Sequence, residues 1–197
     1  MTTKINIKEE KSRIREIYKE KRKCIPEDEK LLRDASICKR FLSLNSYRYA
    51  DVVLLYSPLK NEIDTRAIAV DALAKGKKLA YPRCIEGNRM VYHYVTDLDQ
   101  LIPGKYGIME PKEELPIYAP QLIMHAVCVL PAMVYDKEGY RLGYGKGYYD
   151  RFLSSFKGTK AGLIYSDFVI DKIPRGRFDL RSDIIITEKG VVSFAKN

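Results

Sequence analysis

Short apolar runs that alternate with helix-forming segments are the strongest constraint on what this chain can fold into. The runs lie at 51–58, 78–82, 122–136 and 160–166. They are nearly continuous in hydrophobicity, which is typical of strands that are covered on both faces. A helix signal separates the first two runs, with Asp64 or Thr65 as the cap and Gly76 as the stop. The alternation predicts a single α/β domain over 1–197, a three-layer sandwich with a largely parallel central sheet and helices on both faces.

Helices and loops are predicted around these runs. Good helix formers at three-to-four spacing predict amphipathic helices over 8–23 and 27–44, ahead of the first strand. The pattern of residues 90–95 alternates in hydrophobicity, which predicts a strand with one face more exposed to water. The prolines and glycines of 101–120 allow no long regular element, so we expect a long loop there, either a surface connector or a functional segment. A final strand and turn are predicted over 182–192.

Composition narrows the class of protein. No apolar run approaches the roughly 20 residues of a membrane helix, and the first residues lack the apolar stretch of a secretory signal, so we expect a cytoplasmic protein without a membrane partner. The four cysteines are Cys24, Cys38, Cys84 and Cys128. They form no CxxC pair and no metal-like pattern with histidine, which predicts reduced, packed thiols. His93 and His125 stand in apolar runs and are predicted to be packed core histidines.

The formal net charge of +9 favours a polyanionic partner. Charge alone does not separate a nucleic acid from a small molecule with phosphates or several carboxylates. Much of the excess lies in the first forty residues, where helical spacing predicts a solvated face for most lysines and arginines. The partner therefore has to be inferred from a more specific motif.

The stretch RLGYGKGYYDRF at 141–152 is that motif. Glycines at Gly143, Gly145 and Gly147 permit positive φ and let backbone N–H groups approach phosphate oxygens, at the start of a predicted helix. The same glycines also suit a tight strand-to-helix turn, and Lys146 is what favours phosphate binding. The spacing is neither that of a P-loop nor that of a dinucleotide fingerprint, because Tyr148 stands where the third glycine of the fingerprint would be.

The residues beside the loop leave two readings open. From position alone, Asp150 is better explained as a helix cap than as a ligand of phosphate-bound Mg²⁺. Its neighbours Tyr148 and Tyr149 can stack on a planar ligand or pack beneath the turn. The sequence contains no convincing pair of nucleophile and base, which indicates a reaction driven by positioning and charge stabilisation.

The motif and the residues around it resemble the 5-formyltetrahydrofolate cyclo-ligase family. RLGYGKGYYDRF, preceded by VLPAMVYDKEGY, is similar to the signature of that family. Further matches occur in order along the chain: KSRIR, NEIDT, YPR, GIMEP and FDLRSDIIIT. The resemblance implies an enzyme that uses ATP and Mg²⁺ to convert 5-formyltetrahydrofolate to 5,10-methenyltetrahydrofolate, with release of ADP and phosphate through a phosphorylated formyl intermediate. It also implies a cytoplasmic monomer with no nucleic-acid partner.

The resemblance further implies a set of site residues. The ATP site would be formed by Lys11, Arg15, Arg141, Leu142, Gly143, Tyr144, Gly145, Lys146, Gly147, Tyr148 and Tyr149. The folate site would be formed by Leu59, Glu62, Asp64, Tyr144, Gly145, Lys146, Gly147 and Tyr148. Asp150 and Asp179 would hold magnesium, and Lys146, Arg141 and Tyr148 would be catalytic. Lys11 and Arg15 lie one helical turn apart and can reach one phosphate group. Asp64 can instead cap the following helix, and Glu110 is a weaker candidate that a solvated position would also explain.

Two other classes of function are compatible with parts of the sequence. A sugar-phosphate or coenzyme A binding enzyme on a related α/β scaffold would also use a phosphate-binding glycine loop. A non-enzymatic RNA-binding module would explain the positive charge and the many tyrosines, but the chain lacks the alternation of basic and aromatic residues found in RNA-binding motifs.

Overall fold

A seven-stranded sheet forms the centre of the computed structural model, which describes residues 6–119 and 125–194. The helices are α1 (Ile7–Lys23), α2 (Glu27–Ser43), α3 (Asn45–Arg48), α4 (Arg66–Ala74) and α5 (Tyr148–Leu153). The strands are β1 (Val52–Leu54), β2 (Lys78–Ile85), β3 (Arg89–Val95), β4 (Leu101–Pro103), β5 (Met109–Pro111), β6 (Ala126–Leu130), β7 (Val134–Asp136), β8 (Arg141–Leu142), β9 (Thr159–Leu163), β10 (Val169–Ile170), β11 (Ile184–Ile186) and β12 (Val191–Ser193).

The central sheet has the strand order β12-β11-β9-β6-β1-β2-β3. Neighbours from β11 to β2 are parallel, whereas β12 and β3 pair antiparallel at the two edges. The expected unit of strand, helix and strand is therefore confirmed, since α4 connects the parallel pair β1 and β2. The carboxyl ends of the parallel strands meet at one edge of the sheet, which is where α/β proteins place their ligands.

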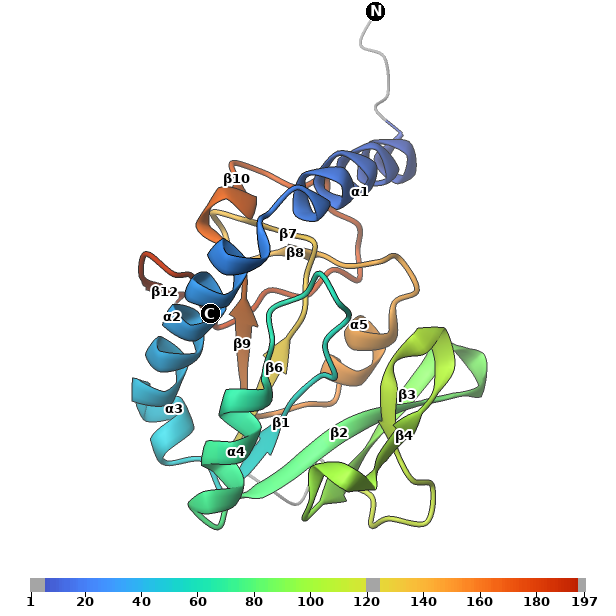
Figure 1. Cartoon of the computed structure of the whole chain (residues 1–197). Coiled ribbons are helices and arrows are strands. Elements are labelled where there is room, and N and C mark those ends of the chain that lie inside the picture. Colours follow the sequence, from blue (N-terminus) through green and yellow to red (C-terminus); the bar gives the residue numbers. More distant parts are fainter. Residues whose placement is uncertain (1–5, 120–124, 195–197) are drawn as a thin grey trace, which may run out of the picture.

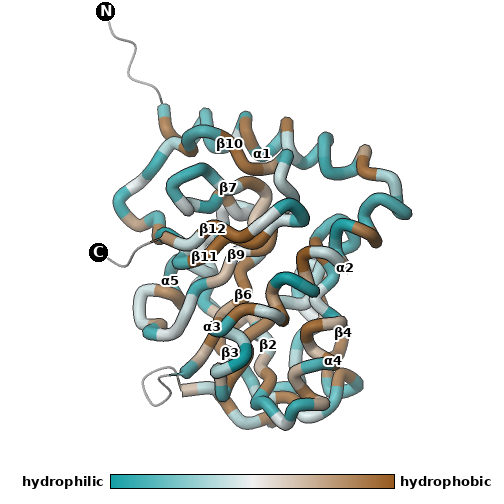
Figure 2. The backbone as a smooth tube through the Cα atoms, turned by 90° about the vertical axis from the view of Figure 1, so that its left-hand side faces the viewer, coloured by the Kyte–Doolittle hydropathy of each residue, from teal (hydrophilic) through white to brown (hydrophobic). Residues whose placement is uncertain are grey.

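Helices cover both faces of this sheet, as predicted (Figure 1). In β1, Val53 packs in the apolar cluster that includes Phe41 of α2 and Ile68 of α4. Its neighbour Val52 points to the opposite face and packs in the cluster that includes Leu153 of α5. This alternation explains why β1 and β6 are apolar at every position, and the brown colour of β6 in Figure 2 reflects it.

The first helix packs on a second, smaller sheet of order β10-β7-β8 rather than on the central one. Its apolar face contributes Ile14, which joins Met133, Val134, Leu142 and Ile173 in a separate cluster. Figure 1 shows α1 lying across β7 and β8 at one end of the molecule, and Figure 2 shows the same arrangement from the side. The polar face of α1 is thereby brought beside the segment that follows β8.

Two sequence predictions differ in detail from the structure. The predicted strand 122–136 is divided into β6 and β7, because Pro131 lies between them and cannot donate a ladder hydrogen bond; 122–124 lie outside the described residues. The predicted loop 101–120 contains the antiparallel pair β4 and β5, each only three residues long, and Pro120 lies outside the described residues.

The histidine and cysteine predictions are partly wrong. His93 is buried, and its Nδ1 lies 2.7 Å from the Leu115 carbonyl oxygen, but His125 is exposed because it precedes β6 at the end of the sheet. Cys38 and Cys128 are buried, whereas Cys24 is exposed in the turn that ends α1. None of the described helices is long and apolar enough to cross a membrane.

Candidate functional site

A cavity of about 310 Å³ opens at the carboxyl ends of the parallel strands. It is bordered by α1, by the segment after β1, by the β2–β3 and β4–β5 hairpins, and by β8 with the start of α5. Of the predicted site residues, the cavity is lined by Lys11, Arg15, Leu59, Glu62, Arg141, Leu142, Gly143, Tyr144, Gly145, Lys146, Gly147, Tyr148, Tyr149, Asp150 and Asp179. The structure therefore gathers every predicted residue except Asp64 around one space.

The glycine loop between β8 and α5 has the conformation that its sequence predicts at two of three positions. Gly145 has φ +90° and Gly147 has φ +74°, both in the left-handed region, whereas Gly143 does not have a positive φ. The carbonyl of Gly143 instead accepts a 2.8 Å hydrogen bond from Nε of Arg15. Helix α1 and the glycine loop are thus joined directly.

We expect Gly145→Ala to destabilise the protein by about 1–2 kcal/mol, because an alanine resists the left-handed conformation. Its Cβ would also lie 3.1 Å from the Arg15 guanidinium, so the contact between α1 and the glycine loop should be disturbed as well. Urea unfolding measures the loss of stability. Gly143→Ala is the matched control, since it has ordinary φ and no atom within 4 Å of the added Cβ. Equal losses of unfolding free energy in Gly145→Ala and Gly143→Ala would contradict the role of the left-handed conformation at Gly145.

The end of the cavity beside α1 is rich in cations. Nζ of Lys11 donates to Oδ2 of Asp179 at 2.5 Å, and the backbone N–H of Gly176 donates to the same oxygen at 2.6 Å. Burial lowers the pKa of the Arg15 guanidinium, and the nearby Asp179 carboxylate opposes this change. Lys11 and Arg15 line the same space, as their helical spacing predicts.

Arg141 and Asp150 form a pair across the glycine loop. Nη2 of Arg141 donates to Oδ1 of Asp150 at 2.7 Å, and Nη1 donates to the carbonyl of Leu180 at 3.3 Å. The Arg141 side chain is only 4% exposed, whereas that of Asp150 is 34% exposed. No side chain caps α5, so the cap that sequence position alone favours for Asp150 is wrong. The carboxylate faces the cavity with Arg141.

Asp150 and Asp179 have the chemistry that a magnesium ion bound to phosphates requires. Such an ion takes one or two carboxylates and completes its coordination with phosphate oxygens and water. Arg141 occupies Oδ1 of Asp150, and Lys11 and Gly176 both occupy Oδ2 of Asp179. These contacts use one oxygen of each carboxylate. Within 6–119 and 125–194 no group of three or more metal-ligating side chains occurs, so a site formed by the protein alone is not indicated there.

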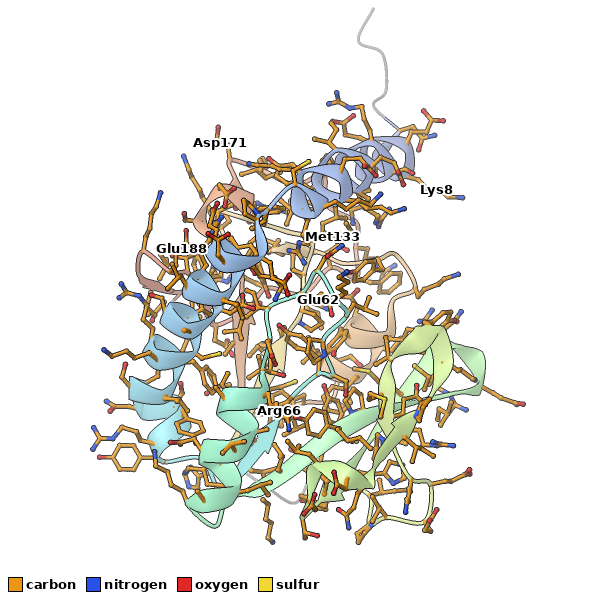
Figure 3. All side chains as sticks on the ribbon, in the orientation of Figure 1. Lys8, Glu62, Arg66, Met133, Asp171 and Glu188 are labelled. Carbon is orange, nitrogen blue, oxygen red and sulfur yellow. The ribbon has the colours of Figure 1, made fainter. Side chains whose placement is uncertain are left out.

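The cavity also contains a buried carboxylate, Glu62. It is 5% exposed, and its Oε2 accepts a 2.9 Å hydrogen bond from the backbone N–H of Leu59. Burial raises the pKa of the Glu62 carboxyl, and hydrogen bonds from Leu59 and Tyr144 oppose the rise. Asp64 is exposed and does not line the cavity; its Oδ1 accepts from the N–H of Arg66 at 2.8 Å and so caps α4. Figure 3 shows Glu62 in the loop between β1 and α4 and Arg66 at the start of that helix.

Several residues that line the cavity were not singled out by the sequence. The hydroxyl of Ser57 is buried without a hydrogen-bond partner among the described residues, and nothing in its local sequence indicates this. Tyr106, at the tip of the β4–β5 hairpin, lies with its hydroxyl 3.4 Å from that of Tyr148. The hydrogen bond with Tyr106 and burial raise the pKa of Tyr148. Glu110, the weaker candidate predicted from the sequence, also lines the cavity. It is 4% exposed rather than solvated, and accepts from the N–H of Cys84 at 3.2 Å.

Comparison with known proteins identifies the family of this chain. A model of the 5-formyltetrahydrofolate cyclo-ligase family matches residues 7–188. The chain belongs to this family. It is 27% identical over 172 residues to the probable 5-formyltetrahydrofolate cyclo-ligase of Schizosaccharomyces pombe, covering 80% of this chain and 84% of that protein. It is 23% identical over 207 residues to the 5-formyltetrahydrofolate cyclo-ligase of Mus musculus, covering 96% of this chain and 98% of that protein.

A solved cyclo-ligase structure supports the fold as well. The NMR structure of Aquifex aeolicus 5,10-methenyltetrahydrofolate synthetase is similar, with a TM-score of 0.82 and 34% identity, covering 95% of this chain and 94% of that chain. Membership of the cyclo-ligase family makes the chain an enzyme, a ligase that acts on a folate of one-carbon metabolism. Use of ATP is implied by the family.

Proposed function

We propose that this cyclo-ligase converts 5-formyltetrahydrofolate to 5,10-methenyltetrahydrofolate through a phosphorylated formyl intermediate, with Mg²⁺ and with ATP as the phosphoryl donor. The observation that carries the proposal is one cavity that combines two chemically different sets of groups. Lys11, Arg15 and the glycine loop offer cations and backbone N–H groups, and Glu62 is a buried carboxylate that lines the same space. A polyanionic nucleotide and a pterin with N–H donors fit these two sets of groups, respectively.

The reaction follows from the chemistry of the formamide. Its oxygen is a poor leaving group, so it first attacks the γ-phosphorus and ADP leaves. N10 of the folate then bonds to the formyl carbon and loses its proton, and the C–O bond breaks as phosphate departs. Such a reaction needs two aligned ligands and neutralisation of the charge that develops on the transferred group.

The glycine loop supplies the groups for phosphoryl transfer. We infer that Arg141 and Lys146 stabilise the charge on the phosphoryl oxygens, and that the protonated hydroxyl of Tyr148 donates a hydrogen bond nearby. Within the described part of the chain the Lys146 ammonium has no ion pair, whereas Arg141 is held by Asp150. Asp150 and Asp179 would hold Mg²⁺, which when bound neutralises phosphate charge as a Lewis acid. We further propose a monomer as the active unit.

The residues proposed to bind folate orient the substrate and take no part in the chemical steps. We infer that Glu62 accepts hydrogen bonds from pterin N–H groups and that Leu59 packs beside the ring. The proposal leaves out Asp64, because its carboxylate caps α4 and does not line the cavity.

The near-ultraviolet absorbance of the methenyl product tests this function. Purified protein is mixed with 5-formyltetrahydrofolate, with and without ATP and Mg²⁺, beside an Asp150→Asn variant. We expect the absorbance to rise only when ATP and Mg²⁺ are both present, and to rise slowly in the variant. No absorbance change from the folded wild-type protein would refute the proposed reaction. A rise in wild-type and variant at the same rate would remove Asp150 from the metal site.

We expect Lys146→Ala to lower kcat by roughly 100-fold while the KM for 5-formyltetrahydrofolate changes little, because the ammonium acts on the transferring phosphoryl group. Steady-state kinetics with each substrate varied in turn measures kcat and the two KM values separately. Lys105→Ala, which removes another exposed lysine at the tip of the β4–β5 hairpin, is the control. Unchanged turnover in Lys146→Ala would exclude this residue from the mechanism.

A further inference from the structure

The segment that carries Glu62 is a tight turn between β1 and α4. The N–H of Glu62 donates to the carbonyl of Leu59 at 2.8 Å, and the Glu62 carboxylate accepts from the Leu59 N–H at 2.9 Å. The Tyr56 hydroxyl donates to the carbonyl of Ile63 at 2.9 Å, close to the end of the turn. The position of the Glu62 carboxylate therefore depends on where residues 63 and 64 are held.

Helix α2 holds the main chain at residue 64. Oδ2 of Asp34 accepts from the backbone N–H of Asp64 at 3.0 Å, and Sγ of Cys38 donates to the backbone carbonyl of Asp64 at 3.2 Å. Asp34 and Cys38 are one helical turn apart and lie on the same face of α2. Both main-chain polar groups of Asp64 are thus bound by a neighbouring helix, two residues after Glu62.

Asp34 is itself held firmly. It is 5% exposed, and besides Asp64 its carboxylate accepts from Nζ of Lys30 at 2.5 Å and from the hydroxyl of Tyr165 at 2.6 Å. A buried carboxylate with three donors has little freedom to move. Burial, together with the Asp34 and Asp64 carboxylates, raises the pKa of the Cys38 thiol to about 12, so the thiol keeps the proton that it donates.

We propose that Asp34 and Cys38 form a clamp on the main chain of Asp64 that sets the position of Glu62 for the formyl-folate substrate. Neither residue lines the cavity, so both are positioning residues that act through the turn. The inference rests on the folate role proposed for Glu62. It also gives NEIDT a role other than the predicted one, because residue 64 contributes its main chain to the clamp and its carboxylate to the cap of α4.

Steady-state kinetics of Asp34→Asn tests the clamp. Asparagine removes the negative charge and one of the two acceptor oxygens, so the side chain can no longer accept from Lys30, Asp64 and Tyr165 at once. We expect the KM for 5-formyltetrahydrofolate to rise about tenfold, with the KM for ATP and kcat within about twofold of wild type. Equal changes in both KM values, or no change in either, would overturn the proposal.

The matched control is Asp71→Asn on α4. Asp71 also accepts from a tyrosine hydroxyl, that of Tyr47, and pairs with a lysine four residues away, Lys75 at 2.8 Å. It does not contact the turn that carries Glu62. We expect this variant to lose some thermal stability, though less than Asp34→Asn because the Asp71 side chain is 29% exposed, while the KM for folate stays at the wild-type value. If the folate KM of the control rises as much as that of Asp34→Asn, the effect is explained by general destabilisation and the clamp is refuted.

A pair of Cys38 variants tests the clamp independently, in case Asp34→Asn does not fold. Cys38→Ala removes the donor to the Asp64 carbonyl, and Cys38→Ser restores one. We expect the folate KM to rise in the alanine variant and to return toward the wild-type value in the serine variant. An unchanged folate KM in the alanine variant would contradict the clamp.

A double-mutant cycle with Glu62→Gln separates the clamp from the proposed function. If Asp34 acts through Glu62, Asp34→Asn should raise the folate KM much less when Glu62 is already replaced. Full additivity would refute the clamp while leaving the role of Glu62 intact. An unchanged folate KM in Glu62→Gln alone would refute the proposed folate role itself.

Discussion

Replacement of Arg141 by methionine is expected to lower kcat by roughly 10²- to 10³-fold, the range found when one preorganised donor to a developing charge is removed. Arg141 is the most buried cation of the cavity, with its side chain 4% exposed. Its guanidinium bonds both Asp150 and the Leu180 carbonyl, so its position is fixed before substrates bind. The variant loses this cation and leaves the Asp150 carboxylate without its partner. Product absorbance under saturating substrates measures the effect.

Two further variants make this prediction specific to the site. Arg141→Lys keeps the charge but cannot bond Asp150 and Leu180 at once, so we expect an intermediate loss. Arg13→Met removes an arginine from the exposed side of α1, where it pairs with Glu10, and should leave kcat unchanged. Wild-type turnover in Arg141→Met would show that the phosphates are stabilised without this residue.

Asp136→Ala is expected to lower the free energy of unfolding by about 3–5 kcal/mol, because it removes a buried carboxylate from a set of donors. Asp136 is fully buried. Its Oδ1 accepts from the N–H groups of Glu138 and Tyr140, and its Oδ2 accepts from the N–H of Ile173 and the guanidinium of Arg175. Without the carboxylate the three main-chain N–H groups lose their acceptor, that of Ile173 in a buried position, whereas Arg175 keeps its ion pair with Glu138. Urea unfolding measures the loss.

Asp171→Ala is the control for this stability prediction. Asp171 points into solvent (Figure 3), and its ion pair with Lys137 is exposed, so its removal should leave the urea midpoint unchanged. Asp136 also holds the turn that leads into β8, and through it Arg141. We therefore expect Asp136→Ala to lower turnover at temperatures where it is still folded. An unfolding free energy close to the wild-type value would mean that the four donors find other partners.

The fold class could be predicted because its signals are local. Apolar runs such as 51–58 have to be covered on both faces, and helices between parallel strands provide that cover. The conformations of Gly145 and Gly147 and the common face of Lys11 and Arg15 are likewise set by spacing along the chain. The boundary between β6 and β7 was missed because an apolar run continues through Pro131, and only strand pairing shows where one sheet ends and the next begins.

The sequence by itself determined the α/β class, the conformation of Gly145 and Gly147, and, through its resemblance to a known family, most of the residues around the cavity. Only the tertiary structure decided which carboxylates face that cavity. Asp150 pairs with Arg141 instead of capping α5, whereas Asp64 caps α4 and is turned away from the cavity. The physical reason is that backbone conformation depends on neighbours in sequence, whereas the partner of a side chain depends on packing. Asp34 lies thirty residues before Asp64, and no local pattern predicts that it binds its main chain.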